Sequence, residues 1–458
     1  MPIKEFKSKI FPWLNEPKWL NRLTLYFVLG AVIITALHVV FSYSGSLHTD
    51  VDSARYMLSA LVQSEAAIVA LVVTLSLVAV QLAASSYSAR VIEVFRRTPD
   101  LWILMGIYGV AIFYGLGVLK MIENPLVGRQ SNLEAQVSFA YYLGVFAFVA
   151  LVPYIWNTLE MLKPSTVINM LAEGITKESI LSANESDRWG EINVEKDPTQ
   201  PIIDIVRIAL VKYDIETIRD GLGDVRKHAE YILRNENIEK NEKEKISQHL
   251  FVHLLRFGEL SASKYDDEST WIAIDNMTKI GIVTVEQKLK GAASFAAISL
   301  MRVGSSAAKN KLEGATIRVA KSFGEIGKTA VEQKLEIVAT EALSFLNLIG
   351  EVAAKQKLKV ATEKIVISII RIGKVLTEHK LIYEIPDVIL SLKEIGKVAA
   401  ETDHIKAADV AQQAAEVFER IGGSGMVKLE DANYTEAYLK KIDELLSRLD
   451  VMMNLKNV

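Results

Sequence analysis

The sequence contains no cysteine. This absence excludes a disulfide framework, cysteine-ligated zinc, iron–sulfur clusters and thiol catalysis. The chain also lacks an excess of basic charge, because 52 Lys and Arg residues stand against 55 Asp and Glu residues, for a net charge of −3 over 458 residues. A nucleic-acid-binding protein with a globally basic surface does not fit this balance, and we expect no nucleic-acid partner.

Sequence motifs of common enzymes are missing as well. The chain has no GxxxxGK[ST] phosphate loop, no GxGxxG fingerprint, no HExxH metal motif and no GxSxG nucleophile elbow. His249 and His253 have the i, i+4 spacing that can bind a metal from one helix face, and His228 precedes them. No carboxylate motif accompanies them, so we expect solvated or core histidines. The sequence therefore predicts no catalytic residue, no metal site, no cofactor and no enzyme.

What the sequence does contain is a set of long apolar runs. Each is long enough, at about 20 residues with a 1.5 Å rise, to cross a hydrocarbon layer of roughly 30 Å. These runs predict a transmembrane domain over 24–157 with four spans, at about 24–43, 58–83, 101–121 and 136–157.

The distribution of Lys and Arg predicts the orientation of these spans. Five basic residues precede the first span, and Arg90, Arg96 and Arg97 follow the second, whereas the other two short loops carry little basic charge. The positive-inside rule therefore places both termini in the cytoplasm of a multi-pass plasma-membrane protein. Segment 1–23 alternates basic and apolar residues and contains Trp13 and Trp19, which predicts an interfacial helix on the inner leaflet.

The second span carries an unusual set of polar residues. One group falls within about 60° on a helix, namely Gln63, Thr74, Gln81, Ser85 and Ser88. Glu65, a candidate intramembrane acid, lies on nearly the opposite side together with Ser76. Polar groups at membrane depth seldom face lipid, so the stripe predicts contact with protein or water. Interhelical hydrogen bonding and pore lining remain about equally supported.

The stretch LSALVQSEAAIVALVVTLSLVAVQLAASSYSARVIEVF at 58–95 resembles a family of uncharacterised prokaryotic membrane proteins, the domain of unknown function 2254. The shared pattern is a small, Ser-rich span that ends in the turn from Leu82 to Arg90. The resemblance extends through the third span to EKDPTQPIIDIVRIALVKYD at 195–214, which is similar to a cytoplasmic Asp-Pro segment of that family. It implies a multispanning layout facing the cytosol and no assigned activity.

The strongest signal in the chain is a tandem repeat. Glycine recurs every 23 residues at positions 258, 281, 304, 327, 350, 373 and 396, usually directly after Ile or Val. A Lys-Leu pair recurs in phase, beginning at Lys288, Lys311, Lys334, Lys357 and Lys380. Because one unit cannot bury its apolar side alone, the repeat predicts an α-solenoid over 258–421, similar to HEAT-type arrays but shorter per unit.

The repeating glycines also predict where helices end. Glycine after an apolar i, i+3 pair is typical of a helix C-terminus, so we expect one helix to stop at each glycine and a short helix to follow. Lys-Leu would then begin a longer helix, as in 334–349. The alternative is one continuous long helix or coiled coil, which the glycines and Pro386 oppose. The lysines would form a ladder along one edge, as a solvated face or a headgroup-facing ridge.

The sequence thus predicts an all-α protein, with a four-span transmembrane domain followed by a cytoplasmic α-solenoid of 23-residue repeats. The remaining segments are a connector at 158–200, three or four packed helices at 201–257 and a C-terminal cap or subunit-contact helix within 422–458.

Two functions fit this organisation. The first is an oligomeric ion channel or transport pore lined by the second span, with the solenoid as a vestibule, gate or sensor. The second is a membrane-anchored scaffold or receptor whose solenoid binds a cytoplasmic protein. The expected partners are the lipid bilayer, further copies of the chain, and in the second case that protein.

Overall fold

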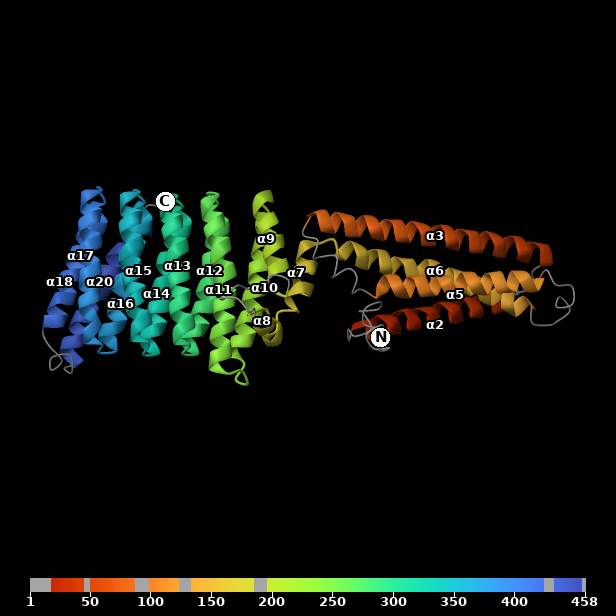
Figure 1. Ribbon diagram of the computed structural model, residues 1–458, viewed down its shortest axis with the longest axis horizontal. Coiled ribbons are helices and arrows are strands. Elements are labelled where there is room, and N and C mark those ends of the chain that lie inside the picture. Colours follow the sequence, from red (N-terminus) through yellow and green to blue (C-terminus); the bar gives the residue numbers. More distant parts are fainter. Residues whose placement is uncertain are drawn as a thin grey trace. The chain divides into compact units, whose positions relative to one another are not determined.

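The structure, a computed structural model, describes residues 18–44, 50–86, 99–122, 133–184, 196–423 and 432–454. Every regular element within these ranges is helical, and none of them contains a strand. The chain forms two compact units, Met1–Val167 and Ile168–Val458 (Figure 1). These observations confirm the predicted all-α class, with apolar spans followed by a repeated helical array.

The first unit is a bundle of four long helices, α2 (Lys18–Ser44), α3 (Val51–Ser86), α5 (Asp100–Ile122) and α6 (Leu133–Glu160). Each contains an apolar segment long enough to cross a membrane, at Leu20–Tyr43, Val51–Leu82, Asp100–Ile122 and Glu134–Glu160. These segments coincide with the four predicted spans and extend some of them. Most of the predicted interfacial segment 1–23 and most of the 84–100 loop lie outside the described residues.

The bundle is held together by aromatic and small side chains. Tyr26, Tyr108 and Tyr154 are buried in one core cluster with Phe146, and α6 contacts the other three helices. The third span contains four glycines, a residue type that lets membrane helices pack closely. Gly115 does so, since a Cβ there would lie 2.7 Å from Val62 Cγ2 on α3. The other three, Gly106, Gly109 and Gly117, have no described atom within 4 Å of that position.

The second unit, Ile168–Val458, is a row of stacked helices (Figure 1). It is called the repeat unit below. It comprises α8 (Lys177–Asn184), α9 (Gln200–Lys212), α10 (Ile215–Arg234), α11 (Lys240–Ser263), α12 (Asp267–Glu286), α13 (Lys290–Lys309), α14 (Glu313–Glu332), α15 (Glu336–Lys355), α16 (Lys359–Glu378), the 3₁₀ turn η3 (Ile382–Glu384), α17 (Ile385–Glu401), α18 (Ile405–Gly423) and α20 (Ala432–Asn454). Helix α7 (Pro164–Ala172) contains the boundary between the two units. Both α7 and α8 lie within the predicted connector.

Helices α10 to α18 form two layers. Each helix packs against the next helix and against the next but one, so that α10, α12, α14, α16 and α18 line one layer and α11, α13, α15 and α17 the other. One structural unit of the solenoid is therefore a pair of helices, or two 23-residue repeats. Helix α20 packs on α16 and α18, with Lys374 Nζ 2.6 Å from Asp443 Oδ1.

The predicted position of the helix ends was wrong. Each 23-residue repeat folds as one helix of about 20 residues, and the repeated glycine lies inside that helix. The short helix expected after each glycine and the long helix expected at 334–349 are parts of such helices. Glycine recurs because the helices approach one another closely. A Cβ at Gly350 would lie 2.7 Å from Ile395 Cδ1 on α17 and 3.1 Å from Ile365 Cγ2 on α16.

The Lys-Leu pair is the actual helix stop. At the end of α14, Lys334 adopts a left-handed conformation with φ of 59°, its N–H donates to Val331 O, and the Leu335 N–H donates to Ala330 O. This is the Schellman motif, with the lysine at the position that glycine usually takes. Lys288, Lys311, Lys357 and Lys380 also have positive φ. The leucine is buried and begins the next helix.

Acidic side chains cap the N-termini of alternate helices, and such contacts occur in both layers. The Asp267 carboxylate of α12 accepts hydrogen bonds from the Gly314 and Ala315 N–H groups of α14, at 3.1 and 2.7 Å. Glu244 and Glu313 bind Gly291 and Val360 in the same way. The first N–H groups of a helix have no partner within it, so these contacts satisfy them and set the spacing between alternate helices.

A fifth helix, α15, is also long and apolar enough to cross a membrane. It lies within the solenoid, where its inward side chains Ala342, Leu346 and Ile349 are fully buried against neighbouring helices. Burial by other helices explains its apolar composition, and we assign it to the array.

His404 occupies the position of the repeating leucine at the last helix stop, next to Asp403 with φ of 65°. Its side chain is buried, and Nδ1 has no hydrogen-bond partner in the part of the chain that the structure describes. Burial and the nearby Lys359 lower the pKa of His404. The folded protein therefore holds it neutral, and stability falls as pH drops below about 6.5, where the unfolded chain takes up a proton.

His404→Leu restores the repeat and removes this imidazole. We expect the free energy of unfolding of the repeat unit to rise by about 1 kcal/mol at pH 7, the usual cost of one unsatisfied buried polar group. The gain should be larger at pH 5 than at pH 7. Urea unfolding of the detergent-solubilised chain at both pH values measures it, and an equal gain at the two values would contradict the assignment.

Candidate functional sites

The polar stripe of α3 lies on the outer surface of the transmembrane bundle. The side chains of Gln63, Thr74 and Gln81 are exposed, whereas α3 packs on α5 and α6 through its opposite side. Thr74 Oγ1 donates to Ala70 O at 2.8 Å, and Gln63 Nε2 donates weakly to Ser59 Oγ at 3.4 Å, both within α3. The side chain of Ser85 and the whole of Ser88 lie outside what the structure describes.

Glu65 and Ser76 point into the same bundle. Only 1% of Glu65 is exposed, and a Cβ at Gly144 of α6 would lie 2.9 Å from Glu65 Oε1. Neither carboxylate oxygen has a hydrogen-bond partner among the described residues. Ser76 Oγ donates to Val72 O at 2.6 Å and is hydrogen-bonded to the Tyr154 hydroxyl of α6. Glu65 therefore packs against α6 of its own chain, on the side of α3 that faces away from the stripe.

A polar network joins three helices at one end of the bundle. Arg22 Nη2 donates to Asn157 Oδ1 at 3.1 Å, and Asn157 Nδ2 donates to Asp100 Oδ2 at 2.6 Å. These residues belong to α2, α6 and α5, so the network fixes the relative register of the three helices. Its side chains bind one another, which indicates a structural role.

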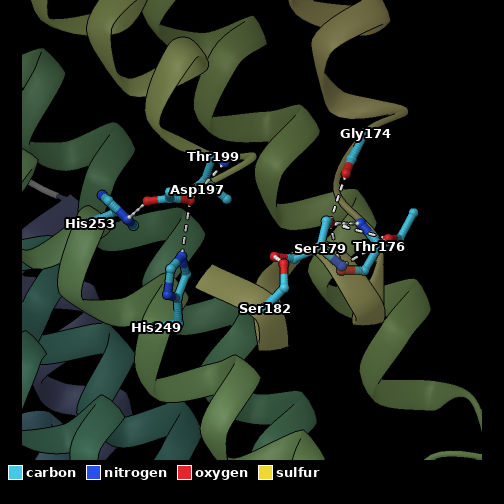
Figure 2. A network of polar contacts seen from close by, with 8 residues as sticks. All are labelled: Gly174, Thr176, Ser179, Ser182, Asp197, Thr199, His249 and His253. Carbon is cyan, nitrogen blue, oxygen red and sulfur yellow. Dashed lines mark hydrogen bonds and ion pairs between the residues drawn. The ribbon is translucent and has the colours of Figure 1, made fainter. Parts of the chain in front are cut away.

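A second cluster of chemically capable residues lies in the repeat unit. Asp197 precedes α9, and His249 and His253 lie one turn apart on α11; all three side chains are buried (Figure 2). His249 Nε2 lies 3.1 Å from Asp197 Oδ1, and His253 Nε2 lies 2.7 Å from Asp197 Oδ2. One donor atom from each residue lies within 4.8 Å of the other two. His228, on α10, hydrogen-bonds the Asp224 carbonyl instead.

Thr199 orients the aspartate. Its backbone N–H and its hydroxyl both donate to Asp197 Oδ1, at 2.9 and 2.6 Å. Burial by itself would raise the pKa of Asp197, but hydrogen bonding to His249 and His253, together with the charge that the two imidazoles can carry, outweighs it and holds the pKa below its usual value. The carboxylate is therefore ionised at neutral pH.

The partner of the two histidines could not be recognised by periodicity. Asp197 lies 52 residues before His249. It is in the non-helical segment just before α9, so it belongs to no helix face that a periodic pattern could reveal. The sequence Asp197-Pro-Thr before an apolar helix was the one sign that this aspartate has a fixed position. An aspartate in a turn just before a helix is commonly held by hydrogen bonds to nearby backbone groups.

Comparisons with known proteins bear on the membrane part. Residues 19–204 match the model of the family described as "Predicted membrane protein (DUF2254)". The protein is a multi-pass membrane protein. The match confirms the resemblance over 58–204 and extends it through the first span; Asp197 lies inside the matched segment.

None of the curated proteins compared with the chain matches it. Two solved structures are similar to it. One is a circular tandem repeat protein with novel repeat topology, at 12% identity and a TM-score of 0.38, covering 89% of this chain and all of that one. The other is the DHF46 filament, at 16% identity and a TM-score of 0.32, covering 39% of this chain and 99% of that one.

Proposed function

We propose that the protein is an oligomeric pore whose water path is lined by α3 of several copies. The observation that supports this most is the exposure of Gln63, Thr74 and Gln81 on the bundle surface at membrane depth. A glutamine facing lipid leaves amide groups without hydrogen-bond partners, which costs several kcal/mol in hydrocarbon. Contact with another copy or with water removes that cost.

The residues of α3 that lie between Gln63 and Gln81 on the stripe favour packing of α3 helices from several copies around a central axis. Ala67, Ala70 and Leu77 fall on the same face as Gln63 and Gln81 and are also exposed. Small residues let helices of neighbouring copies approach closely. Cyclic symmetry then brings the same stripe of each copy to one axis, where several polar rows enclose water.

In this proposal the termini and the repeat unit lie in the cytoplasm and the spans cross the plasma membrane, as the basic residues flanking them predict. The repeat unit acts as a vestibule, gate or sensor. The competing function is a scaffold, and its support is the set of large apolar side chains that the repeat unit exposes, among them Ile337, Tyr383 and Leu390.

Ion flux through liposomes that contain the purified full chain tests the pore. Gln81→Leu should change the flux severalfold, because it removes the amide at one row of the stripe. Leu82→Ile is the control at the same depth, since Leu82 is exposed about 100° away around the helix. Absence of flux across salts, voltages and membrane tension would contradict the pore and favour the scaffold.

A further inference from the structure

Among the described residues, the repeat unit contains one buried set of metal-ligand residues that the proposed pore does not use. We propose that Asp197, His249 and His253 bind a divalent transition-metal cation of the Zn²⁺ class, as a three-ligand site that clamps the 197–200 segment onto α11.

The geometry of the donors supports this assignment. Imidazole nitrogens and carboxylate oxygens bind such cations at about 2.0–2.2 Å, which places neighbouring donors roughly 3.3 Å apart in a tetrahedral site. Here the two histidine nitrogens lie 3.1 and 2.7 Å from the carboxylate oxygens, and the three donors fall within 4.8 Å. Small side-chain rotations convert these spacings into those of a bound ion.

The second support is an unsatisfied buried nitrogen on the same ring. His253 is 1% exposed, and its Nε2 pairs with Asp197 Oδ2 at 2.7 Å. Its other ring nitrogen, Nδ1, has no hydrogen-bond partner among the described residues. Burying an imidazole with one nitrogen unpaired is costly, because buried polar groups normally have partners. A cation bound between Nε2 and Oδ2 would replace the present contact and add a stronger interaction to this ring.

The surroundings prepare these residues for a cation. Thr199 donates two hydrogen bonds to Asp197 Oδ1 and leaves Oδ2 for the metal. Carboxylates that bind metals are commonly held in place by hydrogen bonds of this kind. The i, i+4 spacing holds both histidines on one face of α11, and their rings lie 5.1 Å apart. A carboxylate ligand offsets part of the charge of a divalent ion. The donor set of two imidazoles and one carboxylate suits Zn²⁺, Co²⁺ or Ni²⁺ better than Ca²⁺ or Mg²⁺.

The site would link two stretches of the chain that are distant in sequence. Asp197 and Thr199 come directly before α9, and α11 belongs to the same compact unit. A bound ion therefore adds a cross-link between the segment that follows the membrane part and the start of the solenoid, and it stabilises that end of the array.

Cobalt titration of the untagged, metal-free full chain in detergent tests the proposal. Co²⁺ should bind at one equivalent per chain with visible absorption bands of nitrogen and oxygen ligation, and Zn²⁺ should displace it. Asp197→Asn and His253→Asn should each lose the bands. His228→Asn is the matched control and should keep them, because His228 lies outside the cluster on α10.

Hydrogen exchange on the wild-type chain locates the site without any variant. Zn²⁺ should slow amide exchange in the peptides around 197–200 and 249–253. Failure of the wild-type chain to bind Co²⁺ or Zn²⁺ saturably would overturn the proposal, and the three residues would then form a buried ion-pair network. Binding that His253→Asn does not weaken, or protection confined to other peptides, would overturn it as well.

Discussion

Gly373→Leu is expected to lower the free energy of unfolding of the repeat unit by about 3 kcal/mol, the upper part of the usual range for overpacking a core. A Cβ at Gly373 of α16 would lie 2.5 Å from Phe418 Cζ on α18 and 2.9 Å from Val388 Cγ1 on α17. Phe418 is fully buried, so its ring can move away from the new side chain only by displacing its neighbours. The two neighbouring helices must then separate.

Gly223→Leu is the matched control. Gly223 also lies inside a solenoid helix, α10, but no described atom lies within 4 Å of a Cβ built there. The same substitution should leave stability unchanged or raise it by up to about 1 kcal/mol, because leucine has a higher helix propensity than glycine. Urea unfolding of both variants, followed by circular dichroism, measures the difference. Equal losses in the two variants would contradict the close-packing role of the repeating glycines.

The glycine repeat shows how far sequence pattern goes in this protein. The 23-residue period predicts stacked helices, and the structure has them. Periodicity alone does not distinguish a glycine that ends a helix from one that two neighbouring helices approach, because both follow an apolar pair. The distinguishing residue is the lysine seven positions later, which adopts the left-handed conformation that glycine usually adopts at a helix end.

The membrane part was predicted more completely. Hydropathy and length determine a span almost alone, since backbone groups within the bilayer must bond inside the helix. The side of α3 on which each polar residue lies also follows from the helical angle: Gln63 and Thr74 face outward, and Glu65 faces α6. Hydropathy and helical angle do not determine whether lipid, water or another polypeptide surrounds the outward face.

The Asp197 cluster marks the limit of pattern reasoning in the repeat unit. Two histidines at i, i+4 are visible in the sequence, but their carboxylate comes from a turn 52 residues away. Such a contact depends on how α9 and α11 pack, and that packing is a tertiary property. The sequence therefore identified two of the three residues and predicted solvated or core histidines, whereas the structure buries both and places an acid beside them.

The account of α3 depends on whether its polar stripe meets water. Because the chain has no cysteine, a single introduced cysteine is the only thiol. Thr74 and Leu75 are adjacent, at the same depth, and both are exposed on the bundle, but only Thr74 lies on the stripe. Modification by a membrane-impermeant methanethiosulfonate, applied to the full chain in sealed liposomes, distinguishes water from lipid at each position. We expect Thr74→Cys to react and Leu75→Cys to stay unmodified; equal rates for the two, or an unreactive Thr74→Cys, would contradict a water path along α3.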